Sequence, residues 1–125
     1  MDVAACSQWG VWARKGVTAE SSSATGCDQS GFDSSIGPFR GTDTVANGNG
    51  HAGVDGRSVS VRNLTAQGNT VIGVITVRNM SLSDSVVTGN GLGSGGLDVA
   101  SQEGRIRLRN TVCDHSGGLG LCSID

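Results

Sequence analysis

Three aspartates share one local context that suits acid–base or metal chemistry. Asp33, Asp55 and Asp98 each follow a glycine and an apolar residue. If the chain folds into repeated coils, Asp33 and Asp55 lie on neighbouring coils, one strand spacing of about 4.8 Å apart. Oxygen ligands at this spacing can bind Ca²⁺, and paired carboxylates can act as general acid and base. The alternative interpretation is that these are solvated turn residues that oppose edge-to-edge association.

Arginines form a second candidate site, for an anionic ligand. In "GRIRLRN" (104–110), Arg105, Arg107 and Arg109 alternate with other residues, which places them on one face of a strand. Arg62 and Arg40 extend this basic stripe. Because arginine makes bidentate contacts with carboxylates, the expected ligand is an acidic polysaccharide. The alternative is that the charges only prevent aggregation of an exposed sheet face.

The cysteines suggest one crosslink and leave the compartment open. Cys6 and Cys27 occupy equivalent positions on neighbouring coils, so their Cα atoms are expected within disulfide range. Four cysteines allow three pairings, and the even count favours an oxidising compartment. Buried thiols that stack in the core are the alternative. Since no CxxC pair occurs, a structural zinc site is not expected.

A repeat that covers the chain is the element that must position these residues. The segment "VSVRNLTAQGN" (59–69) recurs as "MSLSDSVVTGN" (80–90) and "IRLRNTVCDHS" (106–116). A glycine followed by an apolar residue comes shortly after most copies, with a two-residue insertion expected before Leu97 and with Gly120-Leu121 as the last example. The first apolar residue of each copy forms a series with intervals of 22, 20, 21 and 26 residues: Val17, Phe39, Val59, Met80 and Ile106.

Each unit of about 21 residues is too small to bury its own apolar face, so the copies must stack on one another. Each copy holds short strands of alternating apolar and polar residues, separated by a glycine turn. Stacking pairs the equivalent strands in parallel around a narrow apolar interior. An interior of this width suits the composition, with 21 glycines, one proline, no tyrosine and 3% aromatic residues.

The repeat resembles the right-handed parallel β-helix of the pectate-lyase-like superfamily, and in particular the β-helix repeats of bacterial surface proteins. The resemblance covers residues 5–122. It implies a single all-β domain over residues 1–125, with five to six coils. In that superfamily an inward polar residue stacks at a turn, often as an asparagine ladder. Here the resemblance assigns this inward column to one residue per coil: Ser21, Asp43, Asn63, Asp84 and Asn110.

The same resemblance bears on the candidate sites. In pectate-lyase-like enzymes, acidic groups outside one sheet hold calcium or act on uronic acid substrates, which are the roles implied for Asp33 and Asp55. "GTDT" (41–44), "GHA" (50–52) and "RIR" (105–107) are distantly similar to polygalacturonase signatures. The paired-aspartate motif of those enzymes is missing, Ala52 replaces a glycine, and Arg107 replaces a lysine. We therefore expect His51 to be an exposed loop residue.

Charge and hydropathy exclude several other classes of protein. A formal net charge of −2 argues against binding to nucleic acid or to an anionic membrane. No apolar run approaches the roughly 18–20 residues that span a bilayer. The first residues, "MDVAACSQWG", lack the pattern of a signal peptide, so either the protein stays where it is made or a leader has been removed. The compartment is open, with a slight preference for the extracellular space or the cell surface.

The sequence thus favours a non-enzymatic β-helix, either structural or carbohydrate-binding, with no cofactor other than calcium. The alternative is a reduced or truncated polysaccharide lyase, hydrolase or epimerase. Six coils would be only about 25 Å long, without the long loops that usually build a substrate cleft. We also expect a homo-oligomer that associates through its end coils, because neither terminus contains a capping helix. The C-terminal coil is the more apolar, with Leu108, Val112, Leu119, Leu121 and Ile124.

Overall fold

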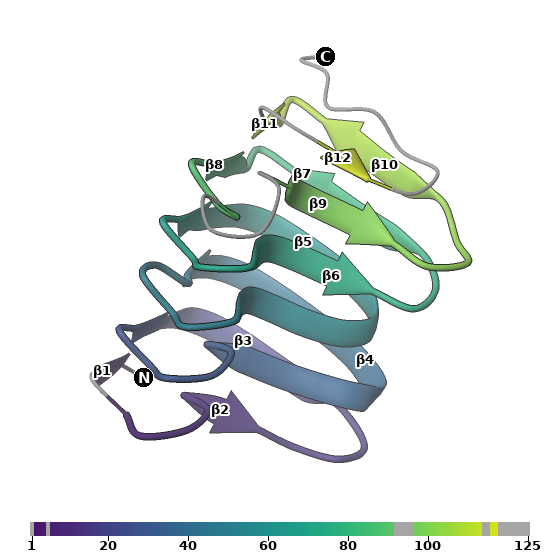
Figure 1. Ribbon diagram of the computed structural model, residues 1–125. Helices are drawn as coiled ribbons and strands as arrows, with labels where there is room; N and C mark the ends of the chain where they lie inside the picture. Colours follow the sequence, from purple (N-terminus) through teal and green to yellow (C-terminus); the bar gives the residue numbers. More distant parts are fainter. Residues whose placement is uncertain (1, 5, 92–96, 114–115, 118–125) are drawn as a thin grey trace.

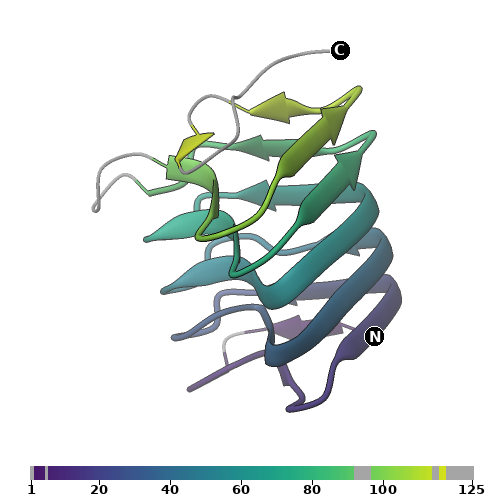
Figure 2. The same cartoon turned by 90° about the vertical axis from the view of Figure 1, so that its right-hand side faces the viewer.

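The computed structural model describes all residues except 1, 5, 92–96, 114–115 and 118–125. Among the described residues every strand pair is parallel and no helix occurs. The chain winds into a β-solenoid of about four turns, fewer than the five to six predicted (Figure 1). Figure 2 shows the same coils from the side, stacked one above another. The all-β, parallel β-solenoid fold predicted from the repeat is confirmed.

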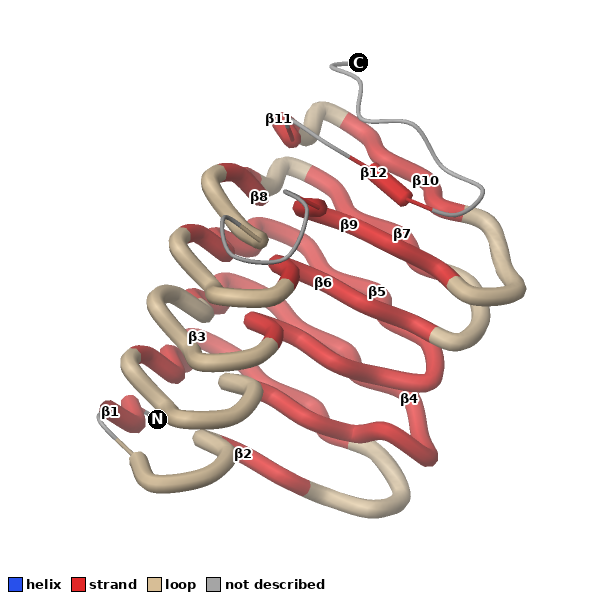
Figure 3. Tube along the Cα trace, viewed as in Figure 1, coloured by secondary structure: helices blue, strands red, loops and turns tan. Residues whose placement is uncertain are grey.

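Twelve strands form the coils in the described part of the chain, and the turns between them are short (Figure 3). Two of the strands, β4 and β5, are long enough to bend around a corner and so contribute to more than one face of the solenoid. In chain order the strands are β1 (Asp2–Ala4), β2 (Val11–Trp12), β3 (Val17–Thr25), β4 (Phe32–Val45), β5 (Ala52–Gln67), β6 (Ile72–Thr76), β7 (Met80–Ser83), β8 (Val86–Thr88), β9 (Leu97–Ser101), β10 (Ile106–Arg109), β11 (Val112–Cys113) and β12 (Ser116–Gly117).

The first series of apolar residues stacks as predicted. Val17 pairs with Phe39, Phe39 with Val59, Val59 with Met80, and Met80 with Ile106. The first four are buried, and Phe39 contacts Phe32 with ring centroids 5.3 Å apart. The interior is therefore a continuous apolar column that each coil extends by one layer.

The second series consists of the apolar residues that follow the recurring glycine, and its predicted register is correct for Val11, Phe32, Val54 and Val74. After Val74 the predicted register is wrong. Val54 pairs with Val74, and Val74 pairs with Val99, so the insertion in the fourth coil has four residues and not two. Leu97 pairs with Ile72, and Ser116 pairs with Val99. The alignment of Ser116 with Asn90 is thus wrong, because the last coil takes a shorter path. The Gly120-Leu121 anchor lies outside the described residues.

Close packing explains why glycine recurs before the second series. A Cβ atom on Gly53 would lie 2.7 Å from the Gly73 carbonyl oxygen and 2.9 Å from Asn69 Nδ2. A Cβ atom on Gly73 would lie 2.7 Å from Asn90 Nδ2. Both glycines allow the backbone of neighbouring coils to approach an inward-pointing amide, so the repeated glycine is a steric requirement of the coil.

The predicted inward polar column is wrong. Asn63 and Asp84 are exposed, as are the other members of the column, and all five have a positive φ, between 46° and 60°. These residues form a corner in the left-handed region, which asparagine and aspartate tolerate better than most residues. Their side chains bond to one another at the surface, for example Asn63 Nδ2 to Asp43 Oδ1 at 2.7 Å.

The inward ladder is formed instead by the residue that follows the turn glycine, namely Asn49, Asn69 and Asn90. Each of the three is at most 2% exposed. The backbone N–H and the side-chain amide of Asn49 both donate to Asn69 Oδ1, each at 3.0 Å. Asn69 bonds to Asn90 Oδ1 in the same way. Each side-chain amide also donates to a backbone carbonyl of the preceding coil, such as Ala46. The ladder therefore satisfies buried turn groups that would otherwise lack partners.

Candidate functional site

The outer face of the sheet formed by β3, β4, β5, β7 and β10 carries four shallow depressions that adjoin one another. We call this surface the trough. Two outward rows of side chains supply most of its polar lining. The first row is Thr18, Arg40, Ser60, Ser81 and Arg107, and the second is Glu20, Thr42, Arg62, Ser83 and Arg109.

These rows follow directly from the parallel register. Ser60 pairs with Ser81, and Ser81 pairs with Arg107, so one hydroxyl or guanidinium group is presented by each coil. Side chains alternate between the two faces of a strand, and the apolar residues between these positions point into the core. Adjacent coils are about 4.8 Å apart, which places Arg62 and Arg109 roughly 10 Å apart along the solenoid.

Positive charge gathers on the trough. Five of the nine basic residues line the depressions, but among the described acidic residues only Glu20 and Asp84 do. Arg62 Nε lies 4.0 Å from Asp84 Oδ2, and the two side chains are 75% and 50% exposed. A contact of this length in water contributes little, so the Arg62 guanidinium group can exchange Asp84 for another anion.

The predicted site residues therefore fall into separate groups. Arg62, Arg107 and Arg109 lie together on the trough. Asp33 and Asp55 lie on a different face of the solenoid, where they pair directly between β4 and β5. The outward column containing this pair runs through Trp12, Asp33, Asp55, Ile75 and Ala100.

Asp98 does not belong to that column, because the insertion is longer than predicted. Asp98 is 1% exposed, and its Oδ1 accepts bonds from Asn90, 3.0 Å from the backbone nitrogen and 2.9 Å from Nδ2. It thus continues the asparagine ladder at the fourth coil. In this position Asp98 makes structural hydrogen bonds with Asn90.

The environment of Asp55 favours its protonated form. Burial and, to a lesser extent, the negative charge of Asp33 raise the pKa of Asp55 from 3.8 to about 6, whereas His51 acts to lower it. Asp33 is 7% exposed. His51 is half-buried in the turn before β5, with Nδ1 3.2 Å from Ser30 Oγ. His51 thus lies in a loop, as expected, but the expectation that it is exposed is wrong.

Sequence reasoning missed an aromatic surface beside this pair. Trp12 pairs with Asp33, and its ring centroid lies 5.9 Å from that of Trp9. The side chains are 54% and 38% exposed for Trp12 and Trp9, and they are the only tryptophans in the chain. The signal was present, since Trp12 precedes Asp33 in the same repeat position.

The polygalacturonase-like segments do not assemble into one site. Thr42 and Arg107 lie on the trough, whereas His51 interacts with Asp55 on another face of the solenoid. Over the described part of the chain, no group of three or more His, Cys, Asp or Glu side chains is arranged to hold a metal ion. Calcium binding by Asp33 and Asp55 would therefore depend on two carboxylates and water.

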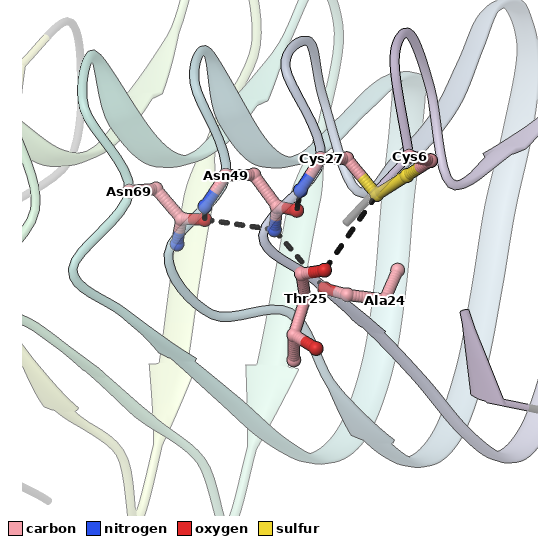
Figure 4. Close-up of a disulfide and its surroundings, with 6 residues drawn as sticks. All are labelled: Cys6, Ala24, Thr25, Cys27, Asn49 and Asn69. Carbon is pink, nitrogen blue, oxygen red and sulfur yellow. Dashed lines mark hydrogen bonds between the residues drawn. A yellow bond between two sulfur atoms is a disulfide. The ribbon is translucent and has the colours of Figure 1, made fainter. Parts of the chain in front are cut away.

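A disulfide stands where the asparagine ladder reaches the first coil. Figure 4 shows Asn69, Asn49 and Cys27 in a row, with Cys6 bonded to Cys27 at the end. The Cys27 N–H donates to Asn49 Oδ1 at 3.0 Å, and the two Cα atoms of the disulfide are 4.4 Å apart. Cys113 is also disulfide-bonded. The crosslink thus joins β1 and β2, through the turn between them, to the second coil.

No helix among the described residues is long and apolar enough to cross a membrane. Comparisons with known proteins find no match, whether to a protein-family model, to a curated protein or to a solved structure.

Proposed function

We propose that this protein is a non-enzymatic carbohydrate-binding solenoid, and that the trough binds an acidic polysaccharide. The observation that supports this proposal is the segregation of charge. A chain with a net charge of −2 gathers five of its nine basic residues on one sheet face. Charge gathered in this way raises the local concentration of an anionic ligand and orients it during association.

The two rows of the trough suit a polymer better than a compact ligand. Hydroxyl groups of Ser60 and Ser81 lie between Arg40 and Arg107 in the first row, and that of Ser83 lies between Arg62 and Arg109 in the second, at the spacing of the coils. Guanidinium groups bind carboxylates or sulfates through two parallel hydrogen bonds, and the serine and threonine hydroxyls can donate to or accept from sugar hydroxyls. An extended chain that crosses several coils would meet these groups repeatedly.

Isothermal titration calorimetry with oligogalacturonate tests the proposal. Replacing Arg62 and Arg107 with Gln should weaken binding about tenfold or more, and added salt should weaken binding to the unaltered protein. The matched control replaces Arg57 and Arg78, which are exposed outside the trough. It removes the same charge and should leave the affinity within about twofold of the unaltered protein. Equal losses in both variants would show only a general charge effect and would contradict a site on the trough.

The alternative function, a polysaccharide lyase, hydrolase or epimerase, makes a different prediction. An enzyme would shorten or epimerise pectin, alginate or a heparin-like polymer during prolonged incubation. The proposed binding module would retain the polymer unchanged. Release of unsaturated or reducing ends that disappears in Asp55→Asn would replace the binding proposal with the enzymatic one.

A further inference from the structure

The two tryptophans and Asp55 form an outward surface, with Asp33 nearly buried between Trp12 and Asp55. Trp12 on β2 pairs with Asp33 on β4, and Asp33 pairs with Asp55 on β5. Trp9 extends the aromatic end, with its ring tilted by 35° relative to that of Trp12. The distance from Trp12 to Asp55 is two strand spacings, roughly 10 Å. This surface lies on a different face of the solenoid from the trough.

The chemistry of this surface is opposite to that of the trough. Exposed tryptophan rings attract cations through their negative faces, and tryptophan is the aromatic side chain best suited to this interaction. The adjacent aspartates add formal negative charge, which also attracts cations. The column ends in Ile75 and Ala100, so charge and aromatic surface are confined to the first three coils that the column crosses.

We propose that Trp9, Trp12, Asp33 and Asp55 bind an organic cation that has an apolar face, such as an amino-sugar oligomer with protonated amino groups. The tryptophan rings would contact the apolar face of the ligand, and an ammonium group would lie against the Asp55 carboxylate. Asp33, which is nearly buried, would act through its charge from below the surface. This inference does not depend on the proposed function of the trough.

The electrostatics of Asp55 support the same assignment. Its carboxylate is destabilised by burial and by Asp33 in the neighbouring coil, whereas His51 from the preceding turn stabilises it. The residue that follows Asp55 in the column is the apolar Ile75. A bound ammonium group would stabilise the ionised carboxylate, and it would therefore lower the pKa of Asp55.

Tryptophan fluorescence with three probes tests the proposal. The probes are a glucosamine trimer, its N-acetylated neutral counterpart and spermidine. We expect a saturable change with the glucosamine trimer, and binding of the neutral trimer weaker by about tenfold or more. Equal binding of spermidine would identify a general alkylammonium site, and preference for the amino sugar would show that the ring contributes.

Variants separate this site from nonspecific attraction. Trp12→Ala and Asp55→Asn should each weaken cation binding about tenfold, whereas Asp28→Asn, an exposed carboxylate elsewhere, should not. Because Asp55→Asn removes no tryptophan, it keeps the fluorescence signal of both rings. Absence of binding at about 10 mM probe, equal affinity for the neutral trimer, or equal effects of Asp28→Asn and Asp55→Asn would overturn the proposal.

Discussion

Asparagine has two roles in this solenoid: it forms an exposed corner with a positive φ, and it forms the buried ladder. Asn63 has a φ of 60° and is exposed, whereas Asn69 is buried in the ladder. The alternation Val59, Val61 predicts that residue 63 points inward. The corner instead shifts the phase by one residue, so Leu64 and Ala66 are the buried positions. The interval between apolar residues is two from Val59 to Val61 and three from Val61 to Leu64, and this change was the sequence signal for the corner.

Substitution at these two asparagines should give different results. Asn69→Leu removes the acceptor of the Asn49 N–H and the donor to the Ala46 carbonyl, and both partners are buried. We expect a loss of roughly 2–5 kcal/mol in the free energy of unfolding, measured by denaturant titration. Asn63→Gly serves as the control. It should change stability by less than about 0.5 kcal/mol, because glycine accepts the positive φ. Similar losses at both positions would contradict the ladder assignment.

Asp55 should give stability a specific dependence on pH. Its pKa rises from 3.8 to about 6 on folding, so the folded state binds the proton more tightly than the unfolded state. The stabilising contribution is complete below about pH 3.8 and is lost as the pH rises through about 6. After allowance for partial solvent exposure, it amounts to about 1–2 kcal/mol.

Thermal unfolding between pH 3.5 and 7.5 tests this dependence. The Asp55→Asn variant should lack the decline that the unaltered protein shows between pH 4 and 6.5. Asp28→Asn is the control and should retain the decline. An identical pH profile for all three proteins would show that the environment of Asp55 has been described wrongly.

At the scale of elements, the N-terminal coil depends on its crosslink. Its strands are short: β1 (Asp2–Ala4) pairs with β3, and β2 (Val11–Trp12) pairs with β4. The Cys6–Cys27 disulfide spans 21 residues and holds this coil at the end of the ladder. The equivalent repeat positions of the two cysteines were visible in the sequence. Their relation to the ladder was not, because the ladder had been placed one turn too early.

Removal of the disulfide should release the first coil before the rest of the solenoid. Closing a loop of this length contributes about 3 kcal/mol in the chain-entropy model. For a Cys6→Ala, Cys27→Ala double variant, hydrogen exchange should accelerate most in residues 2–13. Amides of the central strands β5 and β7 should remain protected. Uniform acceleration across the chain would indicate one cooperative unit and would contradict a separately anchored coil.

At the scale of the whole molecule, the repeat predicts the order in which the coils stack. Local insertions limit how far along the chain that prediction is correct. The series from Val17 to Ile106 is in the predicted register because each coil must place an apolar residue over the last. Val99 was missed because the four-residue insertion before it has no repeat partner. The trough arginines could be grouped from their alternation, but their separation from Asp55 required the path of each corner.

Self-association is a second property of the whole molecule, and it stays a prediction. Leu121 and Ile124, on which an end-to-end dimer would depend, lie outside the described residues. Light scattering at increasing protein concentration should show a dimer, and Leu121→Lys should shift it to monomer or aggregate. A monomer at all concentrations would show that the coils do not associate through their ends.

A calcium response belongs to the same scale, because it is read from the stability of the whole chain. If Asp33 and Asp55 bind Ca²⁺, millimolar calcium should raise the melting temperature, and Asp55→Ala should abolish the rise. Magnesium at the same concentration is the control for ionic strength. An unchanged melting temperature in calorimetry would leave these carboxylates without a role in binding calcium.

The most direct test of the proposed function is to map where an acidic oligosaccharide binds. In a nuclear magnetic resonance titration with oligogalacturonate, we expect saturable shifts in the trough rows, including Thr42, Ser60, Ser81 and the side chains of Arg62 and Arg107. The indole signals of Trp9 and Trp12, on the other face of the solenoid, should remain unchanged. Shifts confined to the tryptophan surface, or no shifts at saturating ligand, would contradict the proposal that the trough is the polysaccharide-binding face.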